Sequence, residues 1–586
     1  MTVVIQFCKL YRNHHGTSSA SVFRAMKTHP LKVVHSKVFS HRPWRLRLAP
    51  VAASALLVLP SLLHAQSTWV GTEGDGGNGA WNVADHWSNS LPDTNNAAQF
   101  YLDAVLTAPS AVIDLPSGTV TPRALTVGAG KSVTLNLGTG VRLEAKQAIS
   151  AIGTNLGTGS GAANLTIAGP ETGTATVQLA SFYVGHNGGN GNTLTFTGGV
   201  TVTDAGTSFS MVGHGGGTGD SSHYNLLRVE EGASLTRFAL YLARGTNSVF
   251  GNRVEVDNAT LAINGGSAAA TSTGFLIGNA ANSSQNALAI TNGGVVTVTT
   301  GVGGSTTNRL ELGAQSGARS NTISVEGTGS LLQLLQGTTL TVGHSNSYGG
   351  NSVTVANGGT INATGAVTIA GYALNGGNND GYNRLVIANG GTFTTETTIT
   401  NHGLVQLASG GVLNGTGSLG IENGARFEVA GSGLAIQATV KAGGVLAVGL
   451  NPLEESQWIL STSVVMQSGA ILELNLFDDG KADRIVFDSG GILDLTAGGV
   501  TLKLLADDTV LTDGATWSLF TGNGFSGSFD IITLPELTDG LVWDLSNFNE
   551  AGSWQVAVIP EPGSSLLICA GLGAVMAFKR RRSSTV

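Results

Sequence analysis

Five charged side chains form the densest group of acids and bases in the central part of the chain. When its repeats are aligned, Arg228 matches Glu255 of the next repeat, Glu230 matches Asp257, and Arg253 lies one position into its own repeat. Carboxylates gathered in this way can hold Ca²⁺ or bind a sugar. The same residues can also form a ladder of ion pairs on a solvated face, where each pair contributes little. The ladder is the favoured interpretation, and no catalytic residue is predicted.

Three histidines suggest a metal site, because His186, His214 and His344 each follow a Val-Gly pair at the same repeat position. The first two fall on successive repeats and could stack. The intervening repeats carry residues such as Arg244 and Asn279 there, and no His-x-His or His-Glu-x-x-His spacing occurs. We therefore predict no metal and no cofactor.

Nucleotide and nucleic-acid binding are excluded on similar grounds. Gly130-Lys131-Ser132 matches the end of a phosphate-binding loop, but Leu125 replaces the required glycine and an alternating strand follows from Val133. The net charge of −8 and the pI near 5.8 argue against a nucleic-acid partner.

The elements that carry these residues are predicted from composition. Glycine accounts for 85 of 586 residues, only 11% of residues are charged, and Thr, Val, Asn, Ser and Leu dominate between residues 66 and 560. This mixture is typical of strands joined by turns. The two cysteines, Cys8 and Cys569, lie in the terminal segments. The central part therefore has no disulfide and no cysteine nucleophile.

The central part consists of repeats. The pattern Asn-x-apolar-x-apolar recurs at intervals of 27 to 35 residues, beginning at Asn192, Asn225, Asn252, Asn286, Asn321, Asn351 and Asn383. One small-residue column follows seven positions later. A second column comprises Gly185, Gly213, Ala243, Gly278, Gly313, Gly343 and Gly371. Each repeat thus predicts a strand, a glycine bend, two further strands and a variable polar loop.

Stacked repeats of this kind can bury alternate residues of every strand while the backbones pair with the coils above and below. The predicted fold is all-β: a right-handed parallel β-helix, or β-solenoid, over 104–450. The recurrent Asn is expected to form an internal ladder of side-chain hydrogen bonds. A β-propeller or a set of sandwiches is the alternative, but propeller blades need about 40–45 residues.

Tryptophans mark the two ends of the array. Trp69, Trp81 and Trp87 lie at the start, four more follow residue 457, and none lies between. We predict an N-terminal Trp-rich cap over 66–103 and a C-terminal antiparallel β domain over 451–558, because open solenoid ends need covering. The N-terminal run also resembles the start of autotransporter-associated β-strand repeat proteins.

Both chain ends are predicted targeting segments with terminal helices. In residues 1–65, three arginines (Arg42, Arg45 and Arg47) precede an apolar run, and a small residue, Ala65, ends the segment. This pattern predicts a secretory signal peptide, read by signal peptidase and the general secretion machinery. A retained N-terminal anchor is the alternative, although the apolar run is short for spanning.

The last segment, 559–586, contains Pro560-Glu561-Pro562, an apolar run from Leu566 to Phe578, and a basic cluster, which consists of Lys579, Arg580, Arg581 and Arg582. The order predicts a short transmembrane stop-transfer tail whose basic end stays cytoplasmic. It resembles the PEP-CTERM sorting signal. That resemblance implies an exosortase-like membrane enzyme as partner, with cleavage near the Pro-Glu-Pro motif and transfer to the surface. A chance tripeptide before an ordinary tail anchor is the alternative.

Taken together, the sequence predicts a non-enzymatic structural or adhesive protein, exported to the cell surface or the extracellular matrix, with a transient or permanent C-terminal anchor. The family resemblance implies that extracellular polysaccharide surrounds the protein and is a candidate partner. Two alternatives are a β-helix polysaccharide lyase or hydrolase, and a sugar-binding protein that uses a Trp-rich cap.

Overall fold

The computed structural model describes residues 66–70, 78–88, 103–106, 110–154, 161–186, 189–205, 209–215, 222–245, 249–265, 274–299, 309–343, 349–370, 381–506, 510–538, 540–548 and 554–561. The chain divides into two compact units, Met1–Leu62 and Leu63–Val586, and all described residues belong to the second. The predicted terminal targeting helices lie outside them. Within the described residues, no helix is long and apolar enough to cross a membrane.

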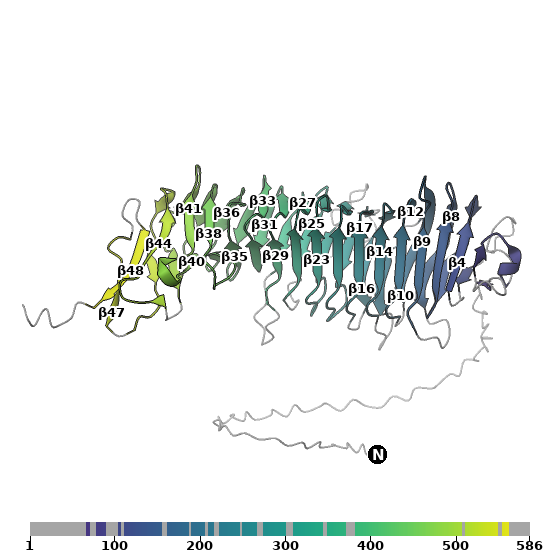
Figure 1. Cartoon of the computed structure of the whole chain (residues 1–586), viewed down its shortest axis with the longest axis horizontal. Helices are drawn as coiled ribbons and strands as arrows, with labels where there is room; N and C mark the ends of the chain where they lie inside the picture. The colour runs from purple at the N-terminus through teal and green to yellow at the C-terminus, as the bar shows by residue number, and fades with distance from the viewer. Residues whose placement is uncertain are drawn as a thin grey trace, which may run out of the picture. The chain divides into compact units, whose positions relative to one another are not determined.

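The described fold is a β-solenoid (Figure 1). Each coil contributes strands to faces within which neighbouring strands run parallel. Two short 3-10 turns, η1 (Ala84–His86) and η2 (Asp478–Gly480), interrupt the strands.

Face 1 is an all-parallel ladder in which the strand after each variable loop pairs with its equivalent on the next coil. Its strands are β2 (Gly79–Ala80), β4 (Ser110–Leu115), β7 (Ser132–Leu137), β9 (Asn164–Ala168), β11 (Thr193–Thr197), β14 (Leu226–Glu230), β17 (Arg253–Asp257), β20 (Ala287–Thr291), β23 (Thr322–Glu326), β26 (Ser352–Ala356), β29 (Arg384–Ile387), β32 (Leu404–Leu407), β35 (Arg426–Val429), β37 (Val445–Val448), β40 (Ile471–Asn475), β43 (Thr501–Leu505) and β46 (Ile531–Thr533).

Face 2 follows the glycine bend and is also parallel as far as β44. Its strands are β5 (Thr119–Val120), β8 (Arg142–Thr154), β10 (Ala175–His186), β12 (Val200–Asp204), β15 (Ser234–Arg237), β18 (Thr260–Ile263), β21 (Val295–Thr299), β24 (Leu331–Leu335), β27 (Thr360–Ala363), β30 (Thr392–Thr395), β33 (Val412–Gly415), β38 (Gln457–Leu460), β41 (Arg484–Phe487) and β44 (Thr516–Thr521).

Face 3 completes each coil, and the long strands β8 and β10 run through the corner so that face 3 and face 2 as far as β33 form one sheet, whereas β38, β41 and β44 belong to a separate sheet. Besides β8 and β10, its strands are β1 (Gln66–Trp69), β3 (Asp103–Leu106), β6 (Leu125–Gly128), β13 (Ser210–Gly215), β16 (Leu240–Gly245), β19 (Gly274–Ile277), β22 (Arg309–Leu312), β25 (Thr339–Val342), β28 (Val367–Ile369), β31 (Thr398–Asn401), β34 (Ser418–Ile421), β36 (Gln437–Val440), β39 (Ser463–Met466), β42 (Ile492–Leu495) and β45 (Phe525–Gly527).

The core lies inside the coils because alternate residues of each strand point inward. In β14, Leu227 and Val229 are fully buried, whereas Arg228 and Glu230 face outward. The same alternation repeats in strand after strand, as the two-residue period of a β-strand requires. The predicted solenoid and its inward and outward residues are confirmed.

The recurrent asparagines form the predicted internal ladder. At one step, the backbone N–H and the side-chain Nδ2 of Asn225 both donate to Oδ1 of Asn252, at 3.0 and 2.9 Å. Matching pairs of hydrogen bonds join the other consecutive members from Asn192 to Asn383, all of them buried. An unpaired buried amide costs about 1–3 kcal/mol, so the ladder satisfies groups that would otherwise oppose folding.

The second small-residue column is explained by this ladder. A Cβ added at Gly213 would lie 2.5 Å from Cγ of Asn252, which is one of the ladder asparagines. Gly213 also has a φ of +77°. The column therefore lacks side chains because the ladder occupies the space and because the backbone is left-handed. Ala243 keeps the left-handed conformation, with a φ of +61°, and packs its methyl group with Val249 and Ala280.

An arginine, Arg237, occupies an inward position of β15 and is fully buried. Its guanidinium donates to the carbonyl oxygens of Leu179 and Ala180 at 3.3 and 3.1 Å, lies 3.4 Å from a carboxylate oxygen of Asp204, and sits over the ring of Phe182. Burial lowers the pKa of Arg237 to about 10, and Asp204 opposes that shift. The group joins three consecutive coils at the corner between faces 2 and 3.

The N-terminal tryptophans cover the first coils. Trp69, Trp81 and Trp87 are buried, and their rings meet edge to face with centroids 4.7–5.0 Å apart. The indole N–H of Trp87 donates to the carbonyl of Trp81 at 2.9 Å. The three rings therefore pack as one buried cluster, and the cap over 66–103 stays a prediction.

An antiparallel C-terminal portion exists, but it is smaller than the expected range of 451–558. Parallel pairing continues on all three faces through β44, β45 and β46. Antiparallel pairs join β44 to β48 (Trp554–Pro560) and β48 to β47 (Leu541–Asp544). The repeat signal weakens after 450 because the ladder asparagines end at Asn383, while the inward alternation that drives stacking persists.

Candidate functional site

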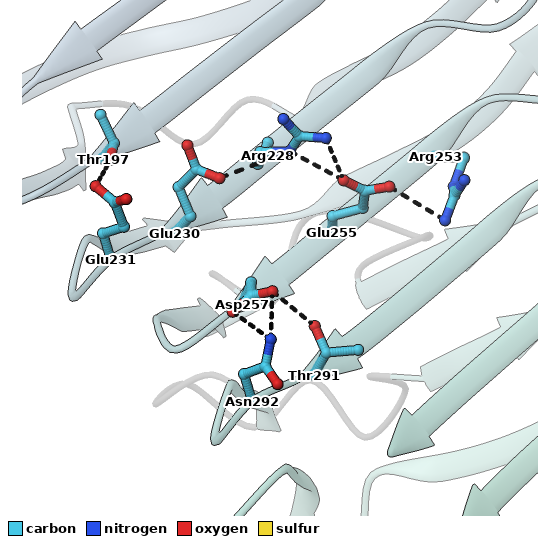
Figure 2. A network of polar contacts seen from close by, with 9 residues as sticks. All are labelled: Thr197, Arg228, Glu230, Glu231, Arg253, Glu255, Asp257, Thr291 and Asn292. Atoms are coloured by element: carbon cyan, nitrogen blue, oxygen red, sulfur yellow. Dashed lines mark hydrogen bonds and ion pairs between the residues drawn. The ribbon is translucent and has the colours of Figure 1, made fainter. Parts of the chain in front are cut away.

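The charged patch predicted from the repeats lies on the outer surface of face 1, on strands β14 and β17 (Figure 2). The register places Arg228 opposite Glu255 and Glu230 opposite Asp257, as the alignment predicted. Arg228 lies 2.9 Å from Glu255 and 3.7 Å from Glu230, and Arg253 lies 3.1 Å from Glu255. The two arginines therefore form a chain of ion pairs across neighbouring coils.

The remaining carboxylates of the patch also have partners. Asp257 accepts hydrogen bonds from the side chains of Thr291 and Asn292, and Glu231 accepts one from Thr197 at 2.8 Å (Figure 2). The patch can thus stabilise the contact between coils, and each exposed pair is worth about 0–1 kcal/mol.

Burial raises the pKa of Glu230, and the adjacent carboxylates add to the shift while Arg228 opposes it. Across the described part of the chain, no group of three His, Cys, Asp or Glu side chains is placed to hold a metal ion.

The predicted histidine stack is present on face 3. The rings of His186 and His214 are parallel within 11°, with centroids 5.1 Å apart, and Tyr183 packs beside both. Burial lowers the pKa of His214 to about 4, and His186 and Arg244 strengthen this effect. His214 is therefore neutral near pH 7. His344 lies outside the described residues.

An aromatic cluster continues from these histidines along face 3 and was not predicted. Arg244 stacks over the rings of Phe209 and Tyr241, at 4.2 and 5.1 Å, and Tyr241 packs with the buried side chains of Met211 and Leu276. A signal was available, since Tyr183, Met211, Tyr241 and Leu276 all lie two residues before the glycine column. The outward side chains of this aromatic cluster are largely covered.

A second unpredicted group lies at the corner that precedes face 1. The ring of His223 stacks on Phe250 with centroids 3.6 Å apart, and Tyr224 meets Phe250 edge on at 5.1 Å. Tyr224 is 61% exposed. These residues occupy the two positions before a ladder asparagine, so the repeat alignment could have drawn attention to them.

The cap tryptophans whose side chains the structure describes are buried or partly buried. Trp69, Trp81, Trp87, Trp458 and Trp517 are buried. Trp517 donates its indole N–H to the carbonyl of Phe477 at 2.8 Å, and Trp543 is partly buried against it. The predicted alternative of sugar binding at a Trp-rich cap therefore finds no exposed ring at these positions.

A hollow of about 750 Å³ lies near the C-terminal end of the solenoid and is lined by residues 452–455, 475–478, 481, 505, 506 and 510. Its charged lining consists of Glu454, Glu455, Asp478 and Lys481. Close by, Asp483 is fully buried and accepts hydrogen bonds from the backbone of Ser456 and from Asn475. Asp483 thereby links the segment just before β38 to the end of β40.

The Pro-Glu-Pro motif begins at the last residue of the last strand, and Glu561 follows it directly. Pro560 ends β48 opposite Leu541, and the backbone N–H of Glu561 donates to the carbonyl of Gly540 at 2.8 Å. Pro562 and the basic cluster Lys579, Arg580, Arg581 and Arg582 lie outside the described residues.

Comparison with known proteins assigns no family. No protein-family model matches the chain, and no curated protein matches it. A solved structure described as a TibC-catalyzed hyper-glycosylated TibA fragment is similar at 16% sequence identity and a TM-score of 0.24, covering 70% of this chain and all of the fragment.

Proposed function

We propose that this chain is a non-enzymatic structural or adhesive protein of the cell surface or extracellular matrix. It is exported through its N-terminal signal segment and processed at Pro560-Glu561-Pro562 by an exosortase-like membrane enzyme. In this proposal the solenoid presents its outer faces and variable loops to an extracellular polysaccharide.

The observation that supports the proposal is the position of Pro560 and Glu561 at the end of the last described strand. β48 completes the C-terminal sheet, and its pairing runs through Pro560 and the N–H of Glu561. The motif therefore begins where the paired strand ends. Cleavage just beyond Glu561 would remove the tail and leave every described strand in place.

The outer surface also supports a structural role. The carboxylates of the charged patch are engaged with Arg228, Arg253 and neighbouring amide and hydroxyl groups, which is the arrangement of a stabilising ladder. A glycoside hydrolase needs two carboxylates that flank the scissile bond. Here Glu255 and Asp257 are held in cross-coil contacts, and Glu230 lies beside Arg228 of its own strand.

The mass of the mature C-terminus, measured on protein from the membrane fraction and from the medium, tests the sorting step. We expect a chain that ends at or just after the Pro-Glu-Pro motif, lacking Arg580–Arg582. Changing Glu561→Ala together with Pro562→Ala should leave the tail attached and the protein in the membrane fraction. Glu536→Ala, an exposed acidic residue nearby, is the matched control and should be processed normally. An intact tail on the wild-type surface protein would contradict the proposal.

A further inference from the structure

The residue before a ladder asparagine adopts a left-handed backbone conformation in six of the seven repeats, the exception being Tyr382 before Asn383. Glycine occupies this position at Gly191, Gly251 and Gly350, whereas Tyr224 and Gln285 adopt it with φ values of 56° and 58°. A residue with a side chain gives up about 1–2 kcal/mol in this region. A bulky ring at such a site therefore calls for an explanation beyond local folding preference.

The ring of Tyr224 is held in a fixed place on the surface. It lies against Gly251 of the next coil so closely that a Cβ there would be 2.5 Å from its Cδ1. Its edge meets Phe250 at an interplanar angle of 86°, and Tyr224 as a whole residue stays 61% exposed. The glycine of the next coil makes room for the ring on that side.

The two rings behind Tyr224 are fixed in turn. The backbone N–H of Phe250 donates to Nδ1 of His223 at 3.2 Å, which requires Nδ1 to be an acceptor. Burial also lowers the pKa of His223, so the imidazole is neutral near pH 7. His223 and Phe250 form an uncharged aromatic base for the exposed tyrosine.

The surroundings indicate an uncharged, hydroxyl-rich ligand. The same corner carries exposed amide side chains, Asn190 on the coil before Tyr224 and Gln285 on the coil after Gly251. The terminal segments 1–65 and 562–586 contain 13 of the 29 basic residues and none of the 37 acidic ones, so residues 66–561 have a formal net charge of −21. This charge disfavours polyanions, and one ring is far smaller than the roughly 800 Å² per partner of a stable protein interface.

We propose that Tyr224, supported by Phe250 and His223, is a stacking site for a pyranose ring of an uncharged polysaccharide. The C–H face of the sugar packs on the tyrosine ring, and amide side chains of the corner reach its hydroxyl groups. The biological meaning of this site rests on the proposed surface location, since only an exported protein would meet such a polymer.

Affinity electrophoresis of the purified exported protein in native gels tests this site. The gels contain dextran, pullulan, hydroxyethyl cellulose or soluble starch as uncharged polymers, with alginate as the polyanion. We expect at least one uncharged polymer to retard the wild-type protein and alginate to leave it unaffected. Tyr224→Gly should weaken the retarding interaction at least tenfold, because it removes the ring.

The variant also separates a binding role from a structural one. Glycine suits the left-handed backbone, so Tyr224→Gly should keep or raise the thermal midpoint. Ser320→Gly makes the same backbone change at the equivalent position three coils away and should retain retardation. If Tyr224→Gly unfolds, Tyr224→Ser replaces it, because the equivalent Ser320 adopts the same conformation.

Absence of retardation by all four uncharged polymers, retardation by alginate alone, or undiminished retardation of a folded Tyr224 variant would overturn the proposal. Binding is measured on purified protein and does not depend on C-terminal processing. A protein that binds sugar but keeps its tail would therefore overturn the sorting proposal alone, and a processed protein that binds none of the uncharged polymers would overturn this one alone.

Discussion

At the scale of single residues, the buried asparagines from Asn192 to Asn351 are stable because each has a hydrogen-bond partner on the next coil. Asn286 shows the principle: its Oδ1 accepts from both amides of Asn252, and its own amides donate to Asn321. The asparagine is therefore donor to one coil and acceptor for the other. Removing one member affects two interfaces of the stack.

We expect Asn286→Ala to lower the free energy of unfolding by about 2–4 kcal/mol, because two buried N–H donors of Asn252 lose their acceptor. The thermal midpoint measured by circular dichroism checks the size of the effect, and hydrogen exchange should rise first around Asn252. Asn292→Ala, which alters an exposed amide bound to Asp257, should change stability little. Equal losses in the two variants would contradict the ladder's role.

Buried and exposed ion pairs should differ sharply in this chain. Asp204→Ala leaves Arg237 buried without its countercharge and the N–H of Phe238 without its acceptor. We expect a loss of about 3–5 kcal/mol in urea unfolding. Glu255→Ala, which removes the carboxylate between two exposed arginines, should cost about 0–1 kcal/mol. A larger loss for Glu255→Ala would show that the outer patch is more than a surface ladder.

At the scale of elements, connections between strands are held by polar side chains that reach across them. Asp483 lies between η2 and β41 and receives N–H groups from Ser456, which precedes β38, and from Asn475 at the end of β40. Burial raises the pKa of Asp483 to about 6, an effect that these hydrogen bonds oppose and Glu455 reinforces. Its ordinary value is near 3.8.

The raised pKa of Asp483 predicts the direction in which the stability of the fold changes with pH. The folded state holds the Asp483 proton more tightly than the unfolded state, so its contribution to stability is present below pH 4 and is lost as the pH rises from about 4 to about 6. Relative to the wild type, Asp483→Asn should become more stable across this interval and then run parallel above it. The measurement is the thermal midpoint of both proteins at half-unit steps of pH. A constant difference between the two curves would exclude a role for this carboxyl.

At the scale of the whole described fold, stability is the sum of contacts between neighbouring coils, so the last coil must be covered. β48 pairs with the edge strand β44 in the antiparallel sense and β47 pairs with β48. Without these two strands, the edge of β44 would present unpaired N–H and C=O groups to other chains.

Ending the chain after Gly540 should therefore cause self-association, detected as an increase in mass by light scattering during size-exclusion chromatography. The matched control ends after Glu561, which keeps β47 and β48 and removes only the tail. We expect the control to elute as the full-length folded protein does. Equal behaviour of the two truncations would show that β47 and β48 do not protect this edge.

Much of the architecture follows from sequence patterns because those patterns are local. The two-residue alternation marks which side chains point inward, and the regular spacing of asparagine and glycine predicts both the coil and the ladder. Arg228 and Glu255 could be placed opposite each other because they keep the same distance from their asparagines. The repeat register alone is enough to place such residues.

The tertiary structure was needed to identify features that the repeat register does not determine, namely certain side-chain contacts between coils and the full extent of the stack. Arg237 meets carbonyl groups 57 and 58 residues earlier, and Tyr224 rests on Gly251 of the next coil. The parallel stack also runs on beyond residue 450, after the asparagine repeat has ended. These contacts depend on where loops of unequal length bring side chains together across coils, and that placement is a property of the packed chain.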